Sequence, residues 1–214
     1  LAKEIHSIPK NFTPHKRIQK IYNERQESIN DGKNIDWATA EALAFATLLK
    51  DGYGVRLSGQ DVGRGTFSHR HAVLYDQDNE KRFVPLRHFR KEQALFEIVD
   101  SFLSEFGVLG FEYGYSQADP KTLVIWEALF GDFSNGAQTI IDQFITTGER
   151  KWLRMSGLTL LLPHGHEGQG PEHTSSRLER FLQMCAEDNI QVANCTSPAN
   201  YFHILRRQMM RDFR

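Results

Sequence analysis

The sequence predicts an α/β domain built on a doubly wound, mainly parallel sheet with helices on both faces. From residue 34 onward, short apolar runs typical of strands alternate with segments of helical periodicity. Strands that alternate with helices of about 10–15 residues indicate βαβ units, whose strands run parallel and whose crossovers are right-handed. Polar side chains also gather at three strand-to-helix junctions, where an open α/β sheet binds its ligands.

The composition is that of a globular protein without a charge bias. A length of 214 residues suffices for one large domain or two small ones. Hydrophobic residues make up 40% of the sequence and charged residues 25%, which is ordinary for a globular protein. Lysine and arginine total 26 and aspartate and glutamate total 27, so charge points to neither nucleic acid nor a membrane surface. No apolar run approaches the roughly 20 residues of a membrane span. Two cysteines, Cys185 and Cys195, favour a reducing compartment over a disulfide scaffold.

Residues 1–33 are interpreted as a linker or N-terminal extension, and residues 34–214 as the domain. The first segment is rich in lysine, arginine, asparagine and glutamine, and Pro9 and Pro14 interrupt it. It is expected to hold one amphipathic helix over about 15–28, wrapped on a surface or belonging to a neighbouring domain. The chain begins Leu-Ala-Lys-Glu, without a methionine or a signal-peptide pattern, so we interpret it as a piece of something longer.

The first half of the domain contains two helices with clear start signals. Asp36 is a suitable N-cap for a helix that runs through Leu49 to the stop at Asp51-Gly52. Ser104 is a suitable N-cap for a second helix that ends near Tyr115. Strands are expected at 54–58, 72–75 and 96–100.

The second half continues the alternation. A helix is expected from Asn135 to Gly148, because one of its faces is apolar at the helical period. A further helix covers about 178–185, and Ser197-Pro198 is an N-cap followed by proline at the first helical position of a helix to about Met210. The apolar face of the first of these helices consists of Ala137, Ile140, Ile141, Phe144 and Ile145. Strands are expected at 123–126, 157–162 and 190–194.

Three junctions carry side chains suited to chemistry. Glu105 lies at the junction after the 96–100 strand, and Phe133 lies at the junction after the 123–126 strand. The third junction is the glycine-rich loop 164–173, which holds three histidines and ends at His173. Since parallel strands end at one edge of a sheet, these three side chains are expected to face a common ligand.

Each of these residues also has a purely structural interpretation. A glutamate in a first helical turn is favoured by the helix dipole alone. Phe133 could be a core aromatic, and His173 could cap the following helix or be an ordinary surface histidine.

Two histidine groups raise the question of a metal. His69 and His71 lie two residues apart, which would put them on one face of a strand. His164, His166 and His173 could suggest zinc, but the sequence contains no HExxH or CxxC pattern. We therefore expect no metal centre built from this chain alone.

Four segments, at these same junctions, resemble one known family. Residues 56–71, 103–114, 125–133 and 162–173 closely resemble the decarboxylating first component of 2-oxoglutarate dehydrogenase complexes, in its transketolase-like pyrimidine-binding domain. The resemblance covers residues 34–214, and the preceding stretch resembles the linker into that domain. It implies oxidative decarboxylation of 2-oxoglutarate and transfer of the succinyl group to a lipoyl group.

The resemblance also implies roles for individual residues. Glu105 matches the glutamate that hydrogen-bonds the aminopyrimidine ring of thiamine diphosphate, where a buried carboxylate stabilises the protonated form of a ring nitrogen. Phe133 matches the aromatic that stacks on that ring. His173 matches an active-site histidine that binds the substrate carboxylate or moves a proton.

Three further residues are expected to line this site. Gln60 is a weaker match for binding the cofactor, and His164 and Gln169 are weaker matches for lining the substrate side. Relatives commonly carry glutamine where this chain has Leu129, so one hydrogen bond to the cofactor or substrate is expected to be missing or replaced by water.

The expected cofactor is thiamine diphosphate with magnesium. The Gly-Asp-Gly motif of the family's diphosphate- and magnesium-binding half is absent from this sequence, so the isolated chain is expected to be inactive and to bind the cofactor weakly. The expected partners are a second subunit in a homodimer, the lipoyl-bearing core of the complex and 2-oxoglutarate, without nucleic acid or membrane. The expected location is the cytoplasm of a bacterium or the mitochondrial matrix of a eukaryote. The alternatives are a 2-oxoadipate dehydrogenase relative and a non-catalytic dimerisation domain.

Overall fold

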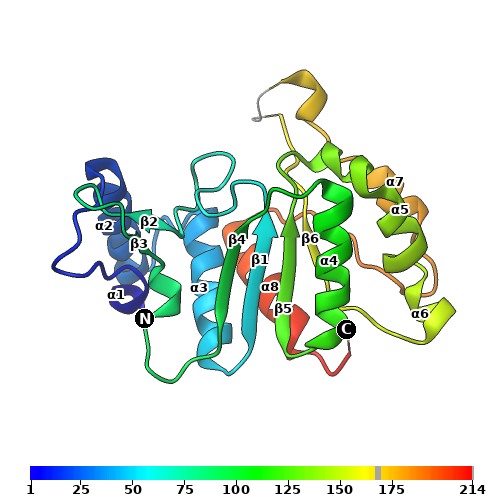
Figure 1. Cartoon of the computed structure of the whole chain (residues 1–214), viewed down its shortest axis with the longest axis horizontal. Coiled ribbons are helices and arrows are strands. Elements are labelled where there is room, and N and C mark those ends of the chain that lie inside the picture. The colour runs from blue at the N-terminus through cyan, green and yellow to red at the C-terminus, as the bar shows by residue number, and fades with distance from the viewer. Residues whose placement is uncertain (167–169, 214) are drawn as a thin grey trace. The chain divides into compact units, whose positions relative to one another are not determined.

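The structure contains a four-stranded parallel sheet flanked by helices (Figure 1). The computed structural model describes residues 1–166 and 170–213. The strand order is β4 (Phe96–Asp100), β1 (Gly54–Gly59), β5 (Thr122–Glu127) and β6 (Thr159–Leu161). This arrangement confirms the α/β fold that the alternating pattern predicts.

The two strands that lead into the site, β5 and β6, pair in parallel. Ile125 lies opposite Thr159, and Glu127 lies opposite Leu161. The pairing extends one residue further, because the Ala128 N–H donates to the Leu161 carbonyl at 3.0 Å. Strand β5 is buried over nearly its whole length, as is typical of a parallel strand that is covered on both sides.

Three helices begin at the N-caps that the sequence predicts. The side-chain oxygens of Asp36, Ser104 and Ser197 each accept a hydrogen bond from the backbone N–H three residues ahead, at 2.7, 3.4 and 3.2 Å. Each cap satisfies one of the N–H groups that a helix leaves unpaired at its start. The helices are α3 (Trp37–Lys50), α4 (Glu105–Ala118) and α8 (Pro198–Met210).

Two of the predicted strands, those at 72–75 and 190–194, do not belong to the parallel sheet, so these two predictions are wrong. The one at 72–75 shortens to β2 (Leu74–Tyr75), which pairs antiparallel with β3 (Arg82–Phe83) in a separate two-stranded sheet. The one at 190–194 is not a strand, although Ile190 and Val192 pack against the hydrophobic core. An alternating apolar pattern reports which side chains are buried, and burial alone does not require ladder hydrogen bonds.

The helix predicted from Asn135 to Gly148 starts earlier and is irregular. It consists of a 3-10 helix, the short α5, a π-helical turn and then α6. Of its predicted apolar face, Ala137, Ile140 and Ile141 are buried, whereas Phe144 is 37% exposed. Because 3-10 and π turns differ from 3.6 residues per turn, the apolar face does not stay in register with the core. The four segments are Gly131–Ala137, α5 (Gln138–Ile140), Ile141–Ile145 and α6 (Gly148–Trp152).

The remaining helical segments are short apart from α2. They are α1 (Ala2–Ile5), α2 (Lys16–Asp31), the 3-10 turns Pro85–Arg87 and Pro171–His173, and α7 (Leu178–Gln183). None of the helices within the described residues is both long and apolar enough to cross a membrane.

The chain forms two compact units, and strands β1 and β4 each contribute residues to both. Unit 1 comprises residues 1–55, 63–98 and 195–210. Unit 2 comprises residues 56–62, 99–194 and 211–214. The three polar junctions predicted from the sequence lie in unit 2.

Unit 1 holds a buried ion pair between Glu41 on α3 and Arg70. The Arg70 Nε atom lies 2.5 Å from Glu41 Oε1, and both side chains are about 5% exposed. Tyr201 on α8 donates its hydroxyl to Glu41 Oε2 at 2.7 Å. Burial by itself would raise the pKa of Glu41, but the Arg70 charge and the hydrogen bonds from Arg70 and Tyr201 outweigh it, so this pKa lies below its ordinary value.

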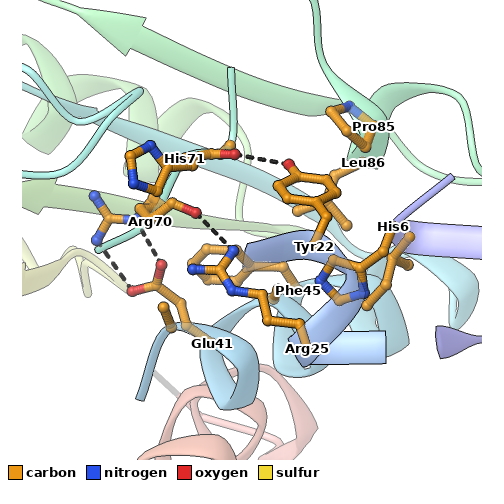
Figure 2. A pocket seen from close by; sticks show the side chains of 13 residues that line it. His6, Tyr22, Arg25, Glu41, Phe45, Arg70, His71, Pro85 and Leu86 are labelled. Carbon is orange, nitrogen blue, oxygen red and sulfur yellow. Dashed lines mark hydrogen bonds and ion pairs between the residues drawn. The ribbon is translucent and has the colours of Figure 1, made fainter. Parts of the chain in front are cut away.

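Helix α2 binds the backbone of the loop that carries Arg70 (Figure 2). The Tyr22 hydroxyl donates to the His71 carbonyl at 2.7 Å, and Arg25 donates to the carbonyls of Arg70 and His69 at 2.9 and 2.5 Å. The cavity beside these groups measures about 20 Å³, room for about one water molecule and far too small for a cofactor. Residues of the predicted linker therefore hold three consecutive carbonyls of the predicted domain.

The buried pair predicts a specific pH dependence of stability. A carboxyl whose pKa is lowered by folding stabilises the fold above its unfolded pKa, here near 4.5, and loses that contribution as the pH falls. Glu41→Gln should lower the free energy of unfolding by about 3 kcal/mol at pH 7, because it leaves Arg70 buried without its partner. The difference from the wild type should shrink below pH 4.5.

Thermal unfolding of the chain as a function of pH measures this difference. The control is Glu24→Gln, which changes an exposed glutamate on α2 and should have little effect at any pH. A constant difference between Glu41→Gln and the wild type from pH 7 to pH 3 would contradict the assignment.

Candidate functional site

A cluster of rings lies where β5 and β6 end, within unit 2. Phe130 precedes the 3-10 helix that carries Asp132 and Phe133, and His173 ends the 3-10 turn that follows β6. Because the two strands are neighbours in the sheet, the segments that follow them meet. The structure thus brings Phe133 and His173 together, as the sequence predicts for these two junctions.

His173 is held on three sides. Its Nδ1 atom lies 3.0 and 3.1 Å from the two carboxylate oxygens of Asp132. Its ring stacks on Phe130, with centroids 3.8 Å apart and planes at 9°, and it meets Phe133 at 5.2 Å and 89°. Glu172 Oε1 lies 3.4 Å from Nε2, but this glutamate is 64% exposed. The imidazole therefore has a fixed plane and a fixed partner at Nδ1.

Glu105 lies in the first turn of α4 beside the same 3-10 helix. It lies against Gly136 of that helix, where an added Cβ would lie 3.3 Å from Glu105 Oε2. The side chain is half-buried, and within the described parts of the chain its carboxylate makes no hydrogen bond or ion pair. Glu105 is thus a carboxylate close to the segment that carries Phe133, with its hydrogen-bonding capacity unused.

His164 is fixed in a different way from His173. Its Nδ1 accepts a hydrogen bond from the Ser176 backbone N–H at 3.1 Å, so the ring proton of this histidine is on Nε2. The loop is closed by a second bond, in which the Gly165 N–H donates to the Thr174 carbonyl at 2.8 Å. The side chain of His164 is exposed, so its Nε2–H is available to a ligand.

Close backbone approaches hold the strand ends together. A Cβ at Gly131 would lie 2.3 Å from the Pro163 carbonyl oxygen and 2.5 Å from the Ser176 Cβ. A Cβ at Gly59, at the end of β1, would lie 2.2 Å from the Glu127 carbonyl oxygen. Only glycine fits such contacts without a shift of the backbone.

The other predicted site residues are not joined to this cluster by a described contact. Gln60 lies in the turn after β1, is half-buried and makes no hydrogen bond within the part of the chain that the structure describes. Gln169 lies outside the described residues. Leu129, at the position where relatives commonly carry glutamine, is partly buried.

The histidines at 69 and 71 do not form the strand-spaced pair that a metal would need. Both lie in a loop, and His71 has a left-handed backbone with φ of 50°. Burial lowers the pKa of His71, whose Nε2 lies 2.8 Å from the Ser68 carbonyl. Among the described residues there is no group of three or more His, Cys, Asp or Glu side chains that could hold a metal ion.

Sequence reasoning missed the residues that hold the two histidines. Asp132, Phe130 and Ser176 lie 41, 43 and 12 positions from the histidine that each contacts. Asp132 directly precedes Phe133 at the predicted junction, but no local pattern pairs it with a side chain on another strand's loop. The pairing of Asp132 with His173 follows only from the fact that β5 and β6 are adjacent strands in the sheet.

Comparison with known proteins places the chain in a family. The sequence model of the family described as transketolase, pyrimidine binding domain, matches residues 33–214. Over its full length the chain is 63% identical to the 2-oxoglutarate dehydrogenase E1 component of Brucella ovis and to that of Brucella canis. It is equally similar to that of Brucella anthropi, again at 63% identity. The chain covers 21% of each of these relatives, about a fifth of their length.

The close approach at Gly131 predicts a matched pair of glycine substitutions. Gly131→Ala should destabilise the chain by about 1–3 kcal/mol, because the Pro163 carbonyl and Ser176 must move apart. Gly114→Ala, in α4 with nothing within 4 Å of the added Cβ, should stabilise it by about 0.5–1 kcal/mol. Thermal unfolding measures both, and a Gly131→Ala protein that melts at or above the wild-type temperature would show that the strand ends are not packed this closely.

Proposed function

The chain belongs to the family of transketolase-type pyrimidine-binding domains, and we propose that it is the pyrimidine-binding part of a thiamine diphosphate-dependent 2-oxoglutarate dehydrogenase. The observation that carries the proposal is 63% identity, over the whole chain, to proteins named 2-oxoglutarate dehydrogenase E1 component. The complete enzyme would decarboxylate 2-oxoglutarate oxidatively and transfer the succinyl group to a lipoyl group. Because the chain spans about a fifth of these relatives, this activity belongs to a longer protein.

The residues of unit 2 fit the pyrimidine end of thiamine diphosphate. Within the described residues Glu105 has no hydrogen-bond or ion-pair partner, so its carboxylate can accept a hydrogen bond from a ring nitrogen and favour the protonated form of that ring. Phe133 has both of its ring neighbours at nearly right angles, so neither stacks parallel on it in the way that an aminopyrimidine would. When bound, the cofactor supplies the carbon nucleophile and the electron sink for decarboxylation.

The other residues would act on the substrate side. His173, with Nδ1 bound to Asp132, would exchange a proton or a hydrogen bond at Nε2, and the exposed His164 would donate from Nε2. Gln60 and Gln169 remain candidates for lining the site. The diphosphate and its magnesium would be held by a part of the longer protein that carries the family's Gly-Asp-Gly motif, which is absent from this sequence.

We also propose that the enzyme is a homodimer whose interface includes one end of α4. Phe102 is fully exposed, and Leu103, Phe106 and Phe111 are each more than half exposed, around the helix that begins with Glu105. A cluster of exposed apolar side chains of this kind marks a surface that another protein covers. A second copy of the chain would cover it and would keep Glu105 away from solvent.

Phe106→Asp tests this interface in the full-length protein. A charge in a desolvated apolar interface should convert the dimer to a monomer in analytical ultracentrifugation, with a loss of activity. The control is Tyr75→Asp, at an aromatic that is 54% exposed on β2, which should remain dimeric. A Phe106→Asp protein that stays dimeric would remove α4 from the interface.

Further partners follow from the same proposal. The lipoyl-bearing core of a 2-oxoacid dehydrogenase complex would accept the acyl group. The enzyme would act in the cytoplasm of a bacterium or in the mitochondrial matrix of a eukaryote. The competing readings are a 2-oxoadipate dehydrogenase and a non-catalytic domain that only holds subunits together.

The deciding experiment is a substrate comparison with the full-length protein. Thiamine diphosphate-dependent decarboxylation of 2-oxoglutarate and of 2-oxoadipate is followed with an artificial electron acceptor. A preference for 2-oxoglutarate supports the proposal, and a preference for 2-oxoadipate changes the substrate but keeps the chemistry. Inactivity with both would favour the non-catalytic reading.

Glu105→Ala in the full-length protein should lower turnover by about 10²–10⁴-fold, the range for loss of a positioned acid or base. The melting temperature should change little, because the described structure gives Glu105 no protein partner. The matched control is Glu179→Ala, which removes an exposed glutamate from the first turn of α7 and should leave turnover unchanged. A wild-type rate in Glu105→Ala would contradict the catalytic assignment.

A further inference from the structure

Asp132 and His173 form a pair in which the proposed function gives a role to His173 and none to Asp132. Both oxygens of Asp132 lie within 3.1 Å of His173 Nδ1, and both side chains are 15% exposed. An ionised carboxylate only accepts hydrogen bonds, so the proton between the two groups belongs to the imidazole Nδ1. Charge-assisted bonds of this kind are among the stronger hydrogen bonds in proteins.

This bond decides which nitrogen of His173 can change its protonation. With Nδ1–H bound to Asp132, the neutral ring has its lone pair on Nε2. When the ring gains a proton, that proton goes to Nε2, and the bond to Asp132 is kept. His173 therefore exchanges protons only at Nε2, along the direction of its lone pair.

Packing fixes the plane of the ring. Phe130 lies parallel to the imidazole at 3.8 Å, and Phe133 meets it at a right angle. A half-turn of the ring about Cβ–Cγ would keep this plane but would take Nδ1 away from Asp132, so the bond to Asp132 selects between the two orientations that the stacking allows. The second carboxylate nearby, Glu172, is mostly exposed and lies 3.4 Å from Nε2, so solvent weakens its influence.

His164 provides a contrast in the same loop. A backbone N–H donates to its Nδ1, so its proton is on Nε2, which is the opposite tautomer from that of neutral His173. The fold thus presents one imidazole that accepts at Nε2 and another that donates at Nε2. Two tautomers in one loop need two different partners, and Asp132 is the partner that sets the tautomer of His173.

We propose that Asp132 is a positioning residue, which fixes the tautomer and the plane of His173 so that Nε2 is the atom that takes up and returns a proton during turnover of the 2-oxo acid. This inference deepens the proposed function and rests on it. Asp132 acts through His173 and does not itself touch the reacting groups.

The test uses the full-length enzyme and a double-mutant cycle. Asp132→Ala should lower kcat for 2-oxoglutarate by about 10²-fold with a change in KM below about threefold, because substrate binding is kept while the acceptor is misplaced. Asp132→Asn should fall between the wild type and Asp132→Ala, because its amide oxygen can still accept from Nδ1–H. In a His173→Ala background, Asp132→Ala should lower kcat no further.

A second readout does not depend on activity. Diethyl pyrocarbonate acylates an unprotonated imidazole nitrogen, and peptide mass spectrometry gives the rate at His173 relative to the exposed His203 on α8. The bond to Asp132 keeps the lone pair on Nε2, the less hindered ring nitrogen, and Asp132→Ala lets the neutral ring take both tautomers, so the relative modification of His173 should slow by at least about threefold. Asp142→Asn, a change at another unit 2 carboxylate that bonds Gln138, should leave both readouts unchanged.

The outcomes separate the two proposals. Equal losses of kcat in the wild-type and His173→Ala backgrounds would overturn the inference, since Asp132 would then act independently of His173. Unchanged turnover and unchanged modification in a folded Asp132→Ala protein would also overturn it. If the parent enzyme lacked 2-oxo acid activity but the modification of His173 slowed, the pairing would stand and the proposed function would fall. If Asp132→Ala does not fold, Asp132→Asn carries both measurements.

Discussion

The site depends on how closely backbone segments approach one another where the strands end. Gly131 lies against the Pro163 carbonyl and Ser176, and Gly59 lies against the Glu127 carbonyl, at distances that no side chain would allow. The contact at Gly131 brings the segment after β5 onto the loop after β6. The positions of Asp132, next to Gly131, and of Ser176 follow directly from that approach. A larger residue at Gly131 would move the partners of both histidines.

The polar side chains at this site in unit 2 differ in whether they have a hydrogen-bond partner in the described part of the chain. His173 and His164 have partners at Nδ1, and Nε2 of His173 has the mostly exposed Glu172 3.4 Å away. Glu105 has no partner within the described residues, although a half-buried carboxylate usually finds one. Such a pattern is costly for folding, and it is expected where a ligand supplies the missing interactions. Fixed imidazoles beside an unpartnered carboxylate thus favour a binding site over a structural core.

Unit 1 shows a different arrangement, in which buried charged side chains bind other groups of the protein. Arg70 is neutralised by Glu41, which also accepts from Tyr201, and Arg25 binds two backbone carbonyls. Removing Glu41 would leave Arg70 as a lone buried charge, which costs several kcal/mol. Since Tyr22 and Arg25 lie before residue 33, the segment ahead of the matched family region is packed onto the loop at 69–71.

The sequence by itself determined the elements whose signals are local. The N-caps Asp36, Ser104 and Ser197 each bond a backbone N–H only three residues ahead, so the local sequence suffices to predict them. The parallel sheet followed from the alternation of strand and helix patterns, and Glu105, Phe133 and His173 followed from the junctions and the family resemblance.

Only the tertiary structure decided how distant segments meet. The pairing of Asp132 with His173, the separate sheet of β2 and β3, and the irregular turns after Gly131 depend on neighbours that are far away in the sequence. A local pattern reports whether a side chain is buried, but not which partner it is buried against.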